Sequence, residues 1–286
     1  MRRPAMEQGA AAMTIERSAD AANAAPVFTI DRLGKTYPTR HGGSVRALDD
    51  VSLRVGQGEF LSIVGPSGCG KSTLLKILAG LAPATAGSVR YRGEVVSKPR
   101  HDVGVVFQEA TLLPWLSVMR NILVPADVAR IGRAKLQPRA LELLELVGLA
   151  GFHDKYPQEL SGGMQQRVAI CRALLRQPAV LLMDEPFGAL DALTREQMNI
   201  ELQRIWSTQR NTVVFITHSI PEAVLLSDRV VVMSRRPGRI LDVLPIDLPR
   251  PRTLDMVNTQ KFGAYAQEAR RLLDQTDAPA SNRQLP

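Results

Sequence analysis

Apolar residues follow one another almost without interruption in five short runs of the chain. These runs are 60–64 (FLSIV), 103–107 (VGVVF), 179–183 (AVLLM), 212–217 (TVVFIT) and 229–233 (RVVVM). Strands with this pattern are buried on both faces, which is the environment of a parallel sheet covered by helices. The pattern therefore predicts an α/β core with a mostly parallel sheet.

Three other stretches alternate apolar and polar residues in part and have turn-forming residues nearby. They are 27–33 (VFTIDRL), 51–55 (VSLRV) and 88–96 (SVRYRGEVV). Half-exposed strands of this kind are typical of antiparallel sheets with one solvated face. We therefore expect an antiparallel β subdomain in the N-terminal part of the chain.

Over about residues 110–160 the strand pattern disappears. Apolar residues at helical spacing predict helices in 116–130 and 138–149, with interruptions at Pro125 and Pro138 because proline lacks a backbone N–H. We interpret this region as a helical subdomain inserted into the α/β core.

The two ends of the chain differ from its centre. Residues 1–26 are rich in alanine and poor in aromatic residues, which is typical of a disordered leader. Near residue 250 the stretch LPRPR predicts a linker, and 253–275 predicts a helix followed by a polar end. The expected organisation is a leader, a main domain over 27–247, and a C-terminal linker and helix over 248–286.

Composition and charge restrict the function only loosely. No apolar run reaches the roughly 18–20 residues that a bilayer-spanning helix needs, and no secretory signal is present, so we expect a cytoplasmic location. Cys69 and Cys171 provide neither a disulfide framework nor metal-ligand spacing. The formal net charge of +8 suits an anionic partner such as nucleotide phosphates, nucleic acid or a membrane surface, and equally a solvated basic surface.

A glycine-rich segment follows the first buried strand. Residues 65–72 (GPSGCGKS) fit the pattern G-x-x-x-x-G-K-[ST] between a predicted strand and an amphipathic helix. Backbone N–H groups of such a loop can surround a polyphosphate, Lys71 can reach its β- and γ-phosphates, and Ser72 can ligate Mg²⁺. The expected contacts are Gly65, Pro66, Ser67, Gly68, Cys69, Gly70, Lys71, Ser72 and Thr73.

Two acidic residues end the run 179–183. Asp184 stands where a carboxylate can hold Mg²⁺ through its water shell. Glu185 points another way, since consecutive residues leaving a strand diverge, and it can act as a base toward an attacking water. A turn cap before Pro186 is the alternative for Glu185.

A helical pattern in LSGGMQQR (160–167) opens with two glycines, although each costs a helix interior about 1 kcal/mol relative to alanine. With Ser161 as N-cap and no side chain at Gly162 and Gly163, the helix N-terminus is open to an anion. An ordinary loop before a helix is the alternative.

Taken in order, these segments resemble the ATP-binding subunits of ABC transporters over about residues 27–247. The resemblance rests on GPSGCGKST, Gln108 in VVFQE, LSGGMQQR, LLMDEP, GALD (188–191) and His218 in FITHS. It implies a P-loop core that hydrolyses ATP with Mg²⁺ as a homodimer, in which LSGGMQQR of one copy closes on the ATP held by the other. It also implies separate membrane permease subunits and, indirectly, an extracytoplasmic solute-binding protein.

The resemblance gives roles to residues that spacing alone does not identify. Tyr37 would stack on adenine, Gln108 would ligate Mg²⁺ or orient water, and His218 would contact the γ-phosphate. Asp191 would couple the two sites, or cap the helix that follows, or both. The implied catalytic residues are Glu185, His218 and Gln108. The implied metal ligands are Ser72, Gln108 and Asp184. The implied nucleotide contacts outside the phosphate loop are Tyr37, Ser161, Gly162, Gly163, Gln165 and Asp191.

The stretch FQEATLLPWLSVMRNILVP (107–125) resembles importer ATPases that serve nitrate, sulfonates and taurine, and implies a peripheral place at the cytoplasmic face of the membrane. Pro114, Trp115 and Leu116 would line a groove for a permease helix, with core packing as the alternative for Trp115. A soluble ABC-type ATPase acting on nucleic acid or ribosomes is the other reading, although such proteins tend to have two cassettes or coiled-coil arms. A P-loop kinase or GTPase is disfavoured by LSGGMQQR.

Overall fold

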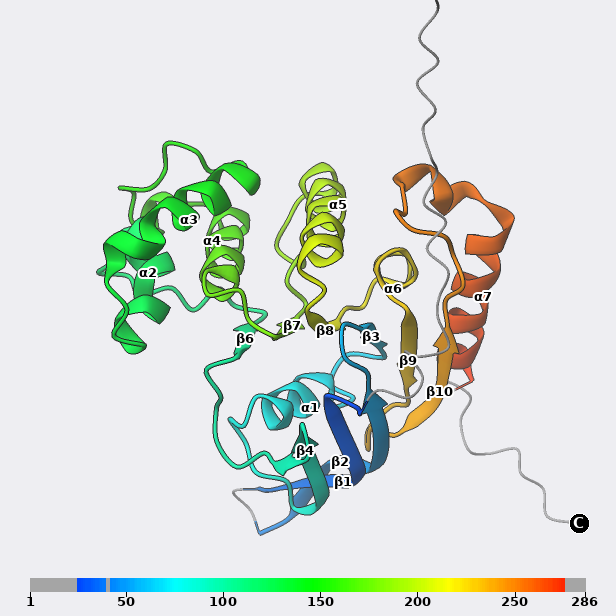
Figure 1. Cartoon of the computed structure of the whole chain (residues 1–286). Coiled ribbons are helices and arrows are strands. Elements are labelled where there is room, and N and C mark those ends of the chain that lie inside the picture. The colour runs from blue at the N-terminus through cyan, green and yellow to red at the C-terminus, as the bar shows by residue number, and fades with distance from the viewer. Residues whose placement is uncertain (1–24, 40–41, 276–286) are drawn as a thin grey trace, which may run out of the picture.

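A six-stranded sheet forms the centre of the protein, and its strands run in the spatial order β10-β9-β3-β8-β7-β6 (Figure 1). The computed structural model describes residues 25–39 and 42–275. All neighbouring strands of this sheet are parallel except β10, which is antiparallel to β9. The strands are β3 (Phe60–Val64), β6 (Val103–Val106), β7 (Val180–Asp184), β8 (Thr212–Ile216), β9 (Arg229–Met233) and β10 (Ile240–Pro245).

The central strands are apolar throughout because both faces of the sheet are covered. Along β8, Val213 and Phe215 pack in the cluster that includes helices α2 to α5, whereas Val214 and Ile216 pack in the cluster that includes α1. The α/β prediction with a mostly parallel sheet is confirmed. The prediction missed β10, which continues the sheet beyond β9 as an antiparallel edge strand.

A second, antiparallel sheet has the order β2-β1-β4-β5, as the half-exposed pattern predicted. Its strands are β1 (Phe28–Pro38), β2 (Ser44–Val55), β4 (Ala86–Tyr91) and β5 (Glu94–Val95). The helix α1 (Lys71–Leu78) lies between the two sheets (Figure 1), and its apolar side chains share one core cluster with both of them. The helix α1 follows β3 in the chain, and residues 65–70 connect the two elements.

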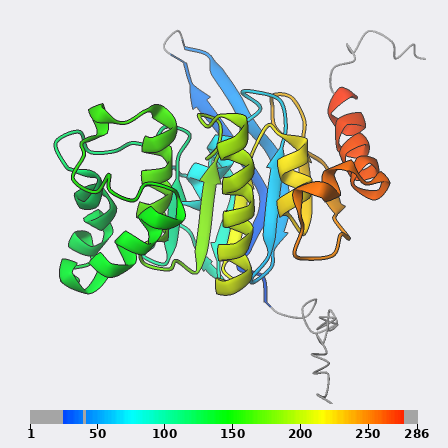
Figure 2. The ribbon, with the colours of Figure 1, turned by 90° about the horizontal axis from the view of Figure 1, so that it is seen from above.

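Five helices of the described residues lie on the side of the large sheet opposite α1, and the first two of them pack against the third beyond the β6 edge. They are α2 (Val118–Val128), α3 (Arg133–Leu146), α4 (Gly162–Leu174), α5 (Ala192–Gln209) and α6 (Ile220–Leu226), with a 3₁₀ turn at Pro157–Glu159. In the view from above, α5 crosses the middle of the sheet and α2 and α3 lie to one side of it (Figure 2). None of the helices in the described ranges is both long and apolar enough to span a bilayer.

The prediction that Pro125 and Pro138 interrupt their helices is wrong. Pro125 lies inside α2 and Pro138 inside α3. Buried apolar residues occur on both sides of Pro125, with Ile122 before it and Ala126 after it. Packing of such a continuous face supplies most of the stability of a helix in a protein, and here it outweighs the one N–H that a proline removes.

The C-terminal segment also differs from the prediction of a single helix over 253–275. It forms a 3₁₀ turn, Leu254–Asn258, and then α7 (Gln260–Asp274), which begins after Thr259. The Thr259 hydroxyl accepts a hydrogen bond from the backbone N–H of Phe262, so this residue caps the helix. Most of the predicted leader, residues 1–24, lies outside the described residues.

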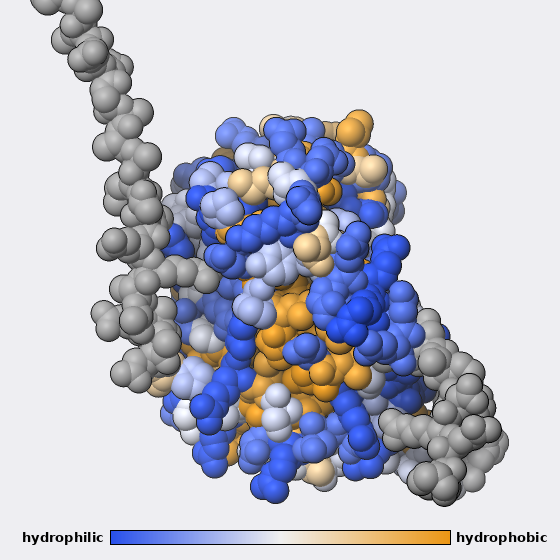
Figure 3. Space-filling model, turned by 90° about the vertical axis from the view of Figure 1, so that its right-hand side faces the viewer, coloured by the Kyte–Doolittle hydropathy of each residue, from blue (hydrophilic) through white to orange (hydrophobic). Residues whose placement is uncertain are grey.

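Side chains of α7 and β10 form the outer flank of the molecule. Seen from this side, a mostly hydrophilic surface surrounds an apolar area in its middle (Figure 3). Leu241 on β10 and Leu254 are exposed apolar residues of this part of the chain. On the inner side, Phe262, Ala269 and Leu272 of α7 pack with α6 and β9.

Arg252 fastens this C-terminal segment to the core, and its side chain is only 1% exposed. Its guanidinium donates hydrogen bonds to five main-chain carbonyls, those of Val224, Leu225, Ser227, Ile246 and Leu248. Its backbone N–H and C=O both pair with the amide of Gln203 on α5. The residue therefore joins the end of α6, the segment after β10 and α5.

We expect Arg252→Met to lower the free energy of unfolding by about 3 kcal/mol, because several buried carbonyls lose their donor together. Urea unfolding followed by circular dichroism measures this change. Lys261→Met is the matched control, since Lys261 pairs with Asp247 at the surface and such pairs contribute little. Equal stability of the two variants would contradict the role given to Arg252.

Candidate functional site

The predicted phosphate loop, residues 65–70, links the end of β3 to the start of α1. The Lys71 side chain is buried, and its ammonium donates hydrogen bonds to the carbonyls of Gly65 (2.8 Å) and Pro66 (3.0 Å). Gly70 has φ 114°, and a Cβ there would lie 2.7 Å from the carbonyl oxygen of Ala47. Only glycine fits that position. The loop therefore curves around the Lys71 ammonium at the N-terminus of α1. A positive charge at the start of a helix suits the binding of an anion.

Asp184 ends β7 at the same edge of the sheet and is 5% exposed. Burial raises the pKa of its carboxyl, against the hydrogen bond that it accepts from Ser72. Its Oδ1 atom is buried without a hydrogen-bond partner. A carboxylate oxygen of this kind beside a hydroxyl fits a hard cation such as Mg²⁺.

Within residues 25–39 and 42–275, no three His, Cys, Asp or Glu side chains lie together as a complete metal site. A cation beside Ser72 and Asp184 would therefore take its other ligands from phosphate oxygens, water or an amide oxygen such as that of Gln108. This is the usual way in which proteins hold Mg²⁺ at nucleotide phosphates.

The three residues predicted to be catalytic lie together around one carboxylate oxygen. Oε2 of Glu185 lies 3.4 Å from Nε2 of Gln108 and 3.4 Å from Nδ1 of His218. Gln108 follows β6, Glu185 follows β7 and His218 follows β8, so the carboxyl ends of three strands supply the group. Glu185 has φ 45°, a backbone conformation that is unfavourable for a residue with a side chain and is common at functional sites.

The two glycines that open α4 differ in their surroundings. A Cβ at Gly162 would meet no atom within 4 Å, so this position faces open space. A Cβ at Gly163 would lie 3.1 Å from Cδ2 of Leu190 and 3.2 Å from the carbonyl oxygen of Ala189. Gly163 thus permits close packing against the segment after Glu185, whereas Gly162 leaves the N-terminus of α4 accessible.

Capping residues define the start of α4 and α5. Ser161 accepts a hydrogen bond from the backbone N–H of Met164, and Asp191 accepts one from that of Thr194 at 3.0 Å. Asp191 is therefore the N-cap of α5, which was one of the two roles expected for it. The Gln165 amide donates to the carbonyls of residues 157 and 160, and so holds the segment that leads into α4.

Two aromatic residues of the prediction are at the surface. Tyr37 on β1 is 37% exposed, and the ammonium of Lys35 lies 4.8 Å from the centre of its ring. Trp115 is 70% exposed, so the core-packing alternative for this residue is wrong. Its indole is available to a partner instead.

Sequence reasoning missed a basic loop that touches the phosphate loop. The guanidinium of Arg236 donates two hydrogen bonds, at 3.0 and 3.1 Å, to the carbonyl oxygen of Gly68. A Cβ at Gly238 would lie 2.2 Å from the carbonyl oxygen of Cys69, so the two loops are in close contact. The cluster of arginines after β9 was the available signal. Its meaning depends on β9 lying beside β3, which the sequence does not reveal.

A buried acidic residue was missed as well. Glu222, on the first turn of α6, is 8% exposed, and its Oε2 accepts a hydrogen bond of 2.6 Å from the Thr217 hydroxyl. Burial raises the pKa of this carboxyl, while Thr217 and the nearby Arg195 act in the opposite direction. The only sequence signal was an acidic residue in an apolar stretch, which has many ordinary explanations.

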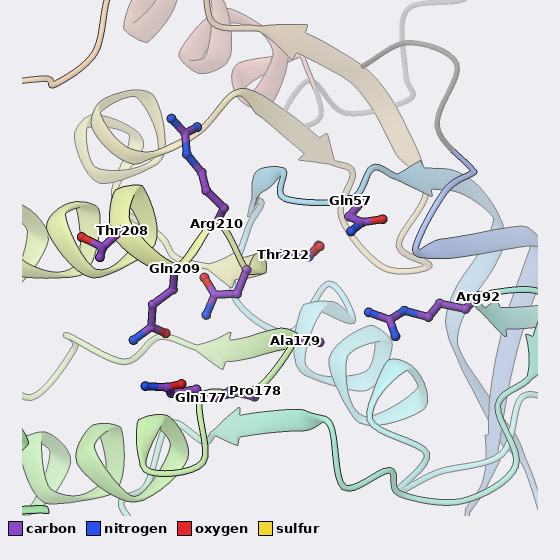
Figure 4. A pocket seen from close by; sticks show the side chains of 10 residues that line it. Gln57, Arg92, Gln177, Pro178, Ala179, Thr208, Gln209, Arg210 and Thr212 are labelled. Carbon is purple, nitrogen blue, oxygen red and sulfur yellow. The ribbon is translucent and has the colours of Figure 1, made fainter. Parts of the chain in front are cut away.

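A hollow of about 420 Å³ lies at the opposite edge of the sheet, near the amino ends of β7 and β8. Figure 4 shows Gln57 and Arg92 on one side of it and Gln177 and Gln209 on the other. It contains none of the residues described above. The candidate site is therefore the surface formed by the carboxyl ends of the strands, where open α/β sheets generally bind ligands.

Comparison with known proteins places this geometry in a family. Residues 48–188 match the sequence profile described as ABC transporter. An uncharacterized ABC transporter ATP-binding protein of Methanocaldococcus jannaschii is 51% identical over 212 residues, 74% of this chain and 79% of the relative. An aliphatic sulfonates import ATP-binding protein of Bacillus cereus is 46% identical over 79% of this chain and 89% of the relative. A taurine import ATP-binding protein of Rhizobium johnstonii is 49% identical over 78% of this chain and 86% of the relative.

A solved dimer, described as a post-hydrolysis state of an ATP-binding cassette bound to ADP and Pi, superimposes with a TM-score of 0.70. The two are 33% identical, and the match covers 78% of this chain and all of the solved one. Both the extent of the sequence similarity and the shared fold lead to one conclusion: this chain belongs to the ATP-binding proteins of the ABC transporter family.

Proposed function

We propose that this ATP hydrolase drives the import of a small sulfonate, taurine or a related solute such as nitrate through separate permease subunits, from the cytoplasmic face of the membrane. The observation that carries the ATPase part is the meeting of Gln108 and His218 at one oxygen of Glu185. The solute class rests on the relatives named for aliphatic sulfonates and taurine. The solute itself would contact the permease and an external binding protein. The residues of this chain therefore do not identify it directly.

Binding of the nucleotide is assigned to the phosphate loop. Backbone N–H groups of residues 67–73 surround the phosphates, and the Lys71 ammonium neutralises the β- and γ-phosphates. Ser72, Asp184 and Gln108 would hold Mg²⁺, which when bound neutralises charge that develops on the phosphates. Tyr37 would offer a ring face to adenine, with Lys35 near the same ring.

Hydrolysis requires an oriented water and a base. Glu185 accepts a proton from a water molecule while the oxygen of that water bonds to the γ-phosphorus. The bond between the γ-phosphorus and the bridging oxygen of the β-phosphate breaks, which yields ADP and phosphate. His218 and Gln108 hold the Glu185 carboxylate and can donate hydrogen bonds toward the γ-phosphate. These contributions are positioning and charge stabilisation, which dominate phosphoryl transfer.

Two copies of the chain would complete two sites. The accessible N-terminus of α4 at Ser161 and Gly162 can approach a phosphate held by a partner copy without steric hindrance. Gln165 and Asp191 lie at the starts of α4 and α5, beside this surface. The solved cassette that shares the fold is dimeric, which supports the same assembly here.

We expect Glu185→Gln to retain ATP binding and to lower turnover by at least about 100-fold, the usual range for loss of a general base. ATP would then accumulate in a dimer detectable by size-exclusion chromatography. Glu196→Gln removes the same charge from the exposed part of α5 and should hydrolyse ATP normally. Wild-type turnover in Glu185→Gln would remove Glu185 from the role of base.

Gly162→Asp should leave ATP affinity of the monomer nearly unchanged and prevent ATP-dependent dimer formation. A Cβ at this position would meet no side chain or neighbouring segment within 4 Å, yet an aspartate carboxylate there would repel the phosphate of a partner copy. Gly162→Ala tests size without charge and should weaken dimerisation less. Equilibrium nucleotide binding and light scattering measure the two properties. Reduced affinity in the monomeric Asp variant would instead place Gly162 at its own nucleotide.

Deletion of the gene that encodes this chain should abolish growth on taurine or an alkanesulfonate as the sole sulfur source, with growth on sulfate unchanged. The wild-type chain should restore growth and Glu185→Gln should not. Unimpaired uptake of these labelled solutes, together with a loss of nitrate uptake, would replace the sulfonate assignment by nitrate. ATP hydrolysis stimulated by RNA or DNA would favour the nucleic-acid alternative.

A further inference from the structure

The Glu222 carboxylate lies behind the segment that carries His218. It accepts a hydrogen bond of 2.6 Å from the Thr217 hydroxyl, and the Thr217 oxygen accepts one of 2.9 Å from the backbone N–H of Ser219. These bonds hold the residues immediately before and after His218. The His218 side chain itself is exposed and faces Glu185.

Arg195 on the first turn of α5 extends this contact to a second loop. Its Nε lies 3.8 Å from Oε1 of Glu222. The same guanidinium donates hydrogen bonds to the carbonyl oxygens of Phe187 (3.3 Å) and Leu190 (2.9 Å). Both carbonyls belong to the segment that follows Glu185. The buried Glu222 and the partly exposed Arg195 therefore join the loop on each side of the candidate catalytic group.

The second loop also touches the start of α4. Leu190 and Ala189 are the neighbours that a Cβ at Gly163 would meet at 3.1 and 3.2 Å. A continuous series of contacts thus runs from the His218 segment through Glu222, Arg195 and Leu190 to Gly163. It connects the groups that face a chain's own ATP with the surface that would face the ATP of a partner.

Burial of a carboxylate is costly unless a charge and hydrogen bonds compensate for it, and Glu222 has both. Thr217, Arg195 and Glu222 lie outside the phosphate loop, and their side-chain hydrogen bonds go to partners other than Glu185. The hydrogen bonds and the ion pair of these three side chains go to the backbone or to one another. A role in holding two loops at a set separation accounts for this arrangement, and a misplacement of about 1 Å can lower a rate 100-fold.

We propose that Glu222 is a positioning residue which, with Arg195 and Thr217, holds the His218 segment and the 185–191 segment at the separation that ATP hydrolysis requires. This inference rests on the proposed function of Glu185 and His218. It predicts an effect on turnover and not on nucleotide affinity. It also predicts that the effect passes through His218.

The test compares Thr217→Val, which removes the hydroxyl that donates a hydrogen bond to Glu222, with Thr217→Ser, which keeps it. We expect Thr217→Val to lower kcat about 10-fold with the KM for ATP unchanged, and Thr217→Ser to retain most of the turnover. In a His218→Ala background, Thr217→Val should cause little further loss, because the group that it positions is already absent. Wild-type kcat in Thr217→Val, or a full additional 10-fold loss in the His218→Ala background, would overturn the proposal.

Glu222→Gln and Arg195→Met give a second measurement that does not depend on the fold tolerating a valine at position 217. Their effects on kcat should be strongly non-additive in the double variant, because both remove the same contact. Additive effects would overturn the proposal. Glu185→Gln is assayed alongside these variants. Normal turnover there would refute the catalytic role proposed for Glu185, whereas its inactivity combined with additive effects would refute only the role of Glu222.

Discussion

The parallel pairing of β6, β7, β8 and β3 is the constraint on which the site depends. Backbone register sets Asp184 opposite Ile216 and Ile63 opposite Ile216, so these strands end at one edge of the sheet. The loops that leave this edge supply the phosphate loop, Glu185 and His218 within a few residues of the last hydrogen-bonded pair. The pairing survives because both faces of the sheet are buried, with α1 on one side and the α4 to α6 layer on the other. A slip of one strand by one residue would turn each of its side chains to the other face and displace the candidate catalytic group that follows the strand.

Buried polar side chains connect the elements that apolar packing alone would leave free to slide. Arg252 binds carbonyls at the end of α6, and Glu222 binds Thr217 from the first turn of the same helix. This short helix is therefore held at both ends, from the C-terminal segment and from the site. Hydrogen bonds are directional, whereas the hydrophobic effect is not, so such residues define positions that a core cluster only brings together. Their cost in desolvation is offset only when every partner is in place.

Conformations that a stability criterion would avoid occur at the site. Glu185 has a positive φ, and two glycines open α4 although alanine would favour the helix. Each has a local reason in the structure. The left-handed backbone at Glu185 turns its carboxylate toward Gln108 and His218, Gly163 packs against Leu190, and Gly162 leaves the helix N-terminus uncovered. At the candidate site these departures from ideal geometry thus coincide with specific contacts or with an uncovered helix end.

The sequence alone was sufficient for the fold class, the two kinds of sheet and the place of the glycine-rich loop between β3 and α1, because each depends on local pattern or on a motif of contiguous residues. It was misleading where tertiary packing overrides local preference, as at Pro125 and Pro138 inside their helices, and it did not indicate the edge strand β10. It also could not show that Arg236 touches the phosphate loop or that Glu222 holds the His218 segment to the loop after Glu185. These contacts join residues from different elements, and only the order of strands and the packing of helices bring them together. Local periodicity records how each segment is buried, whereas the choice of neighbour is made by the whole fold.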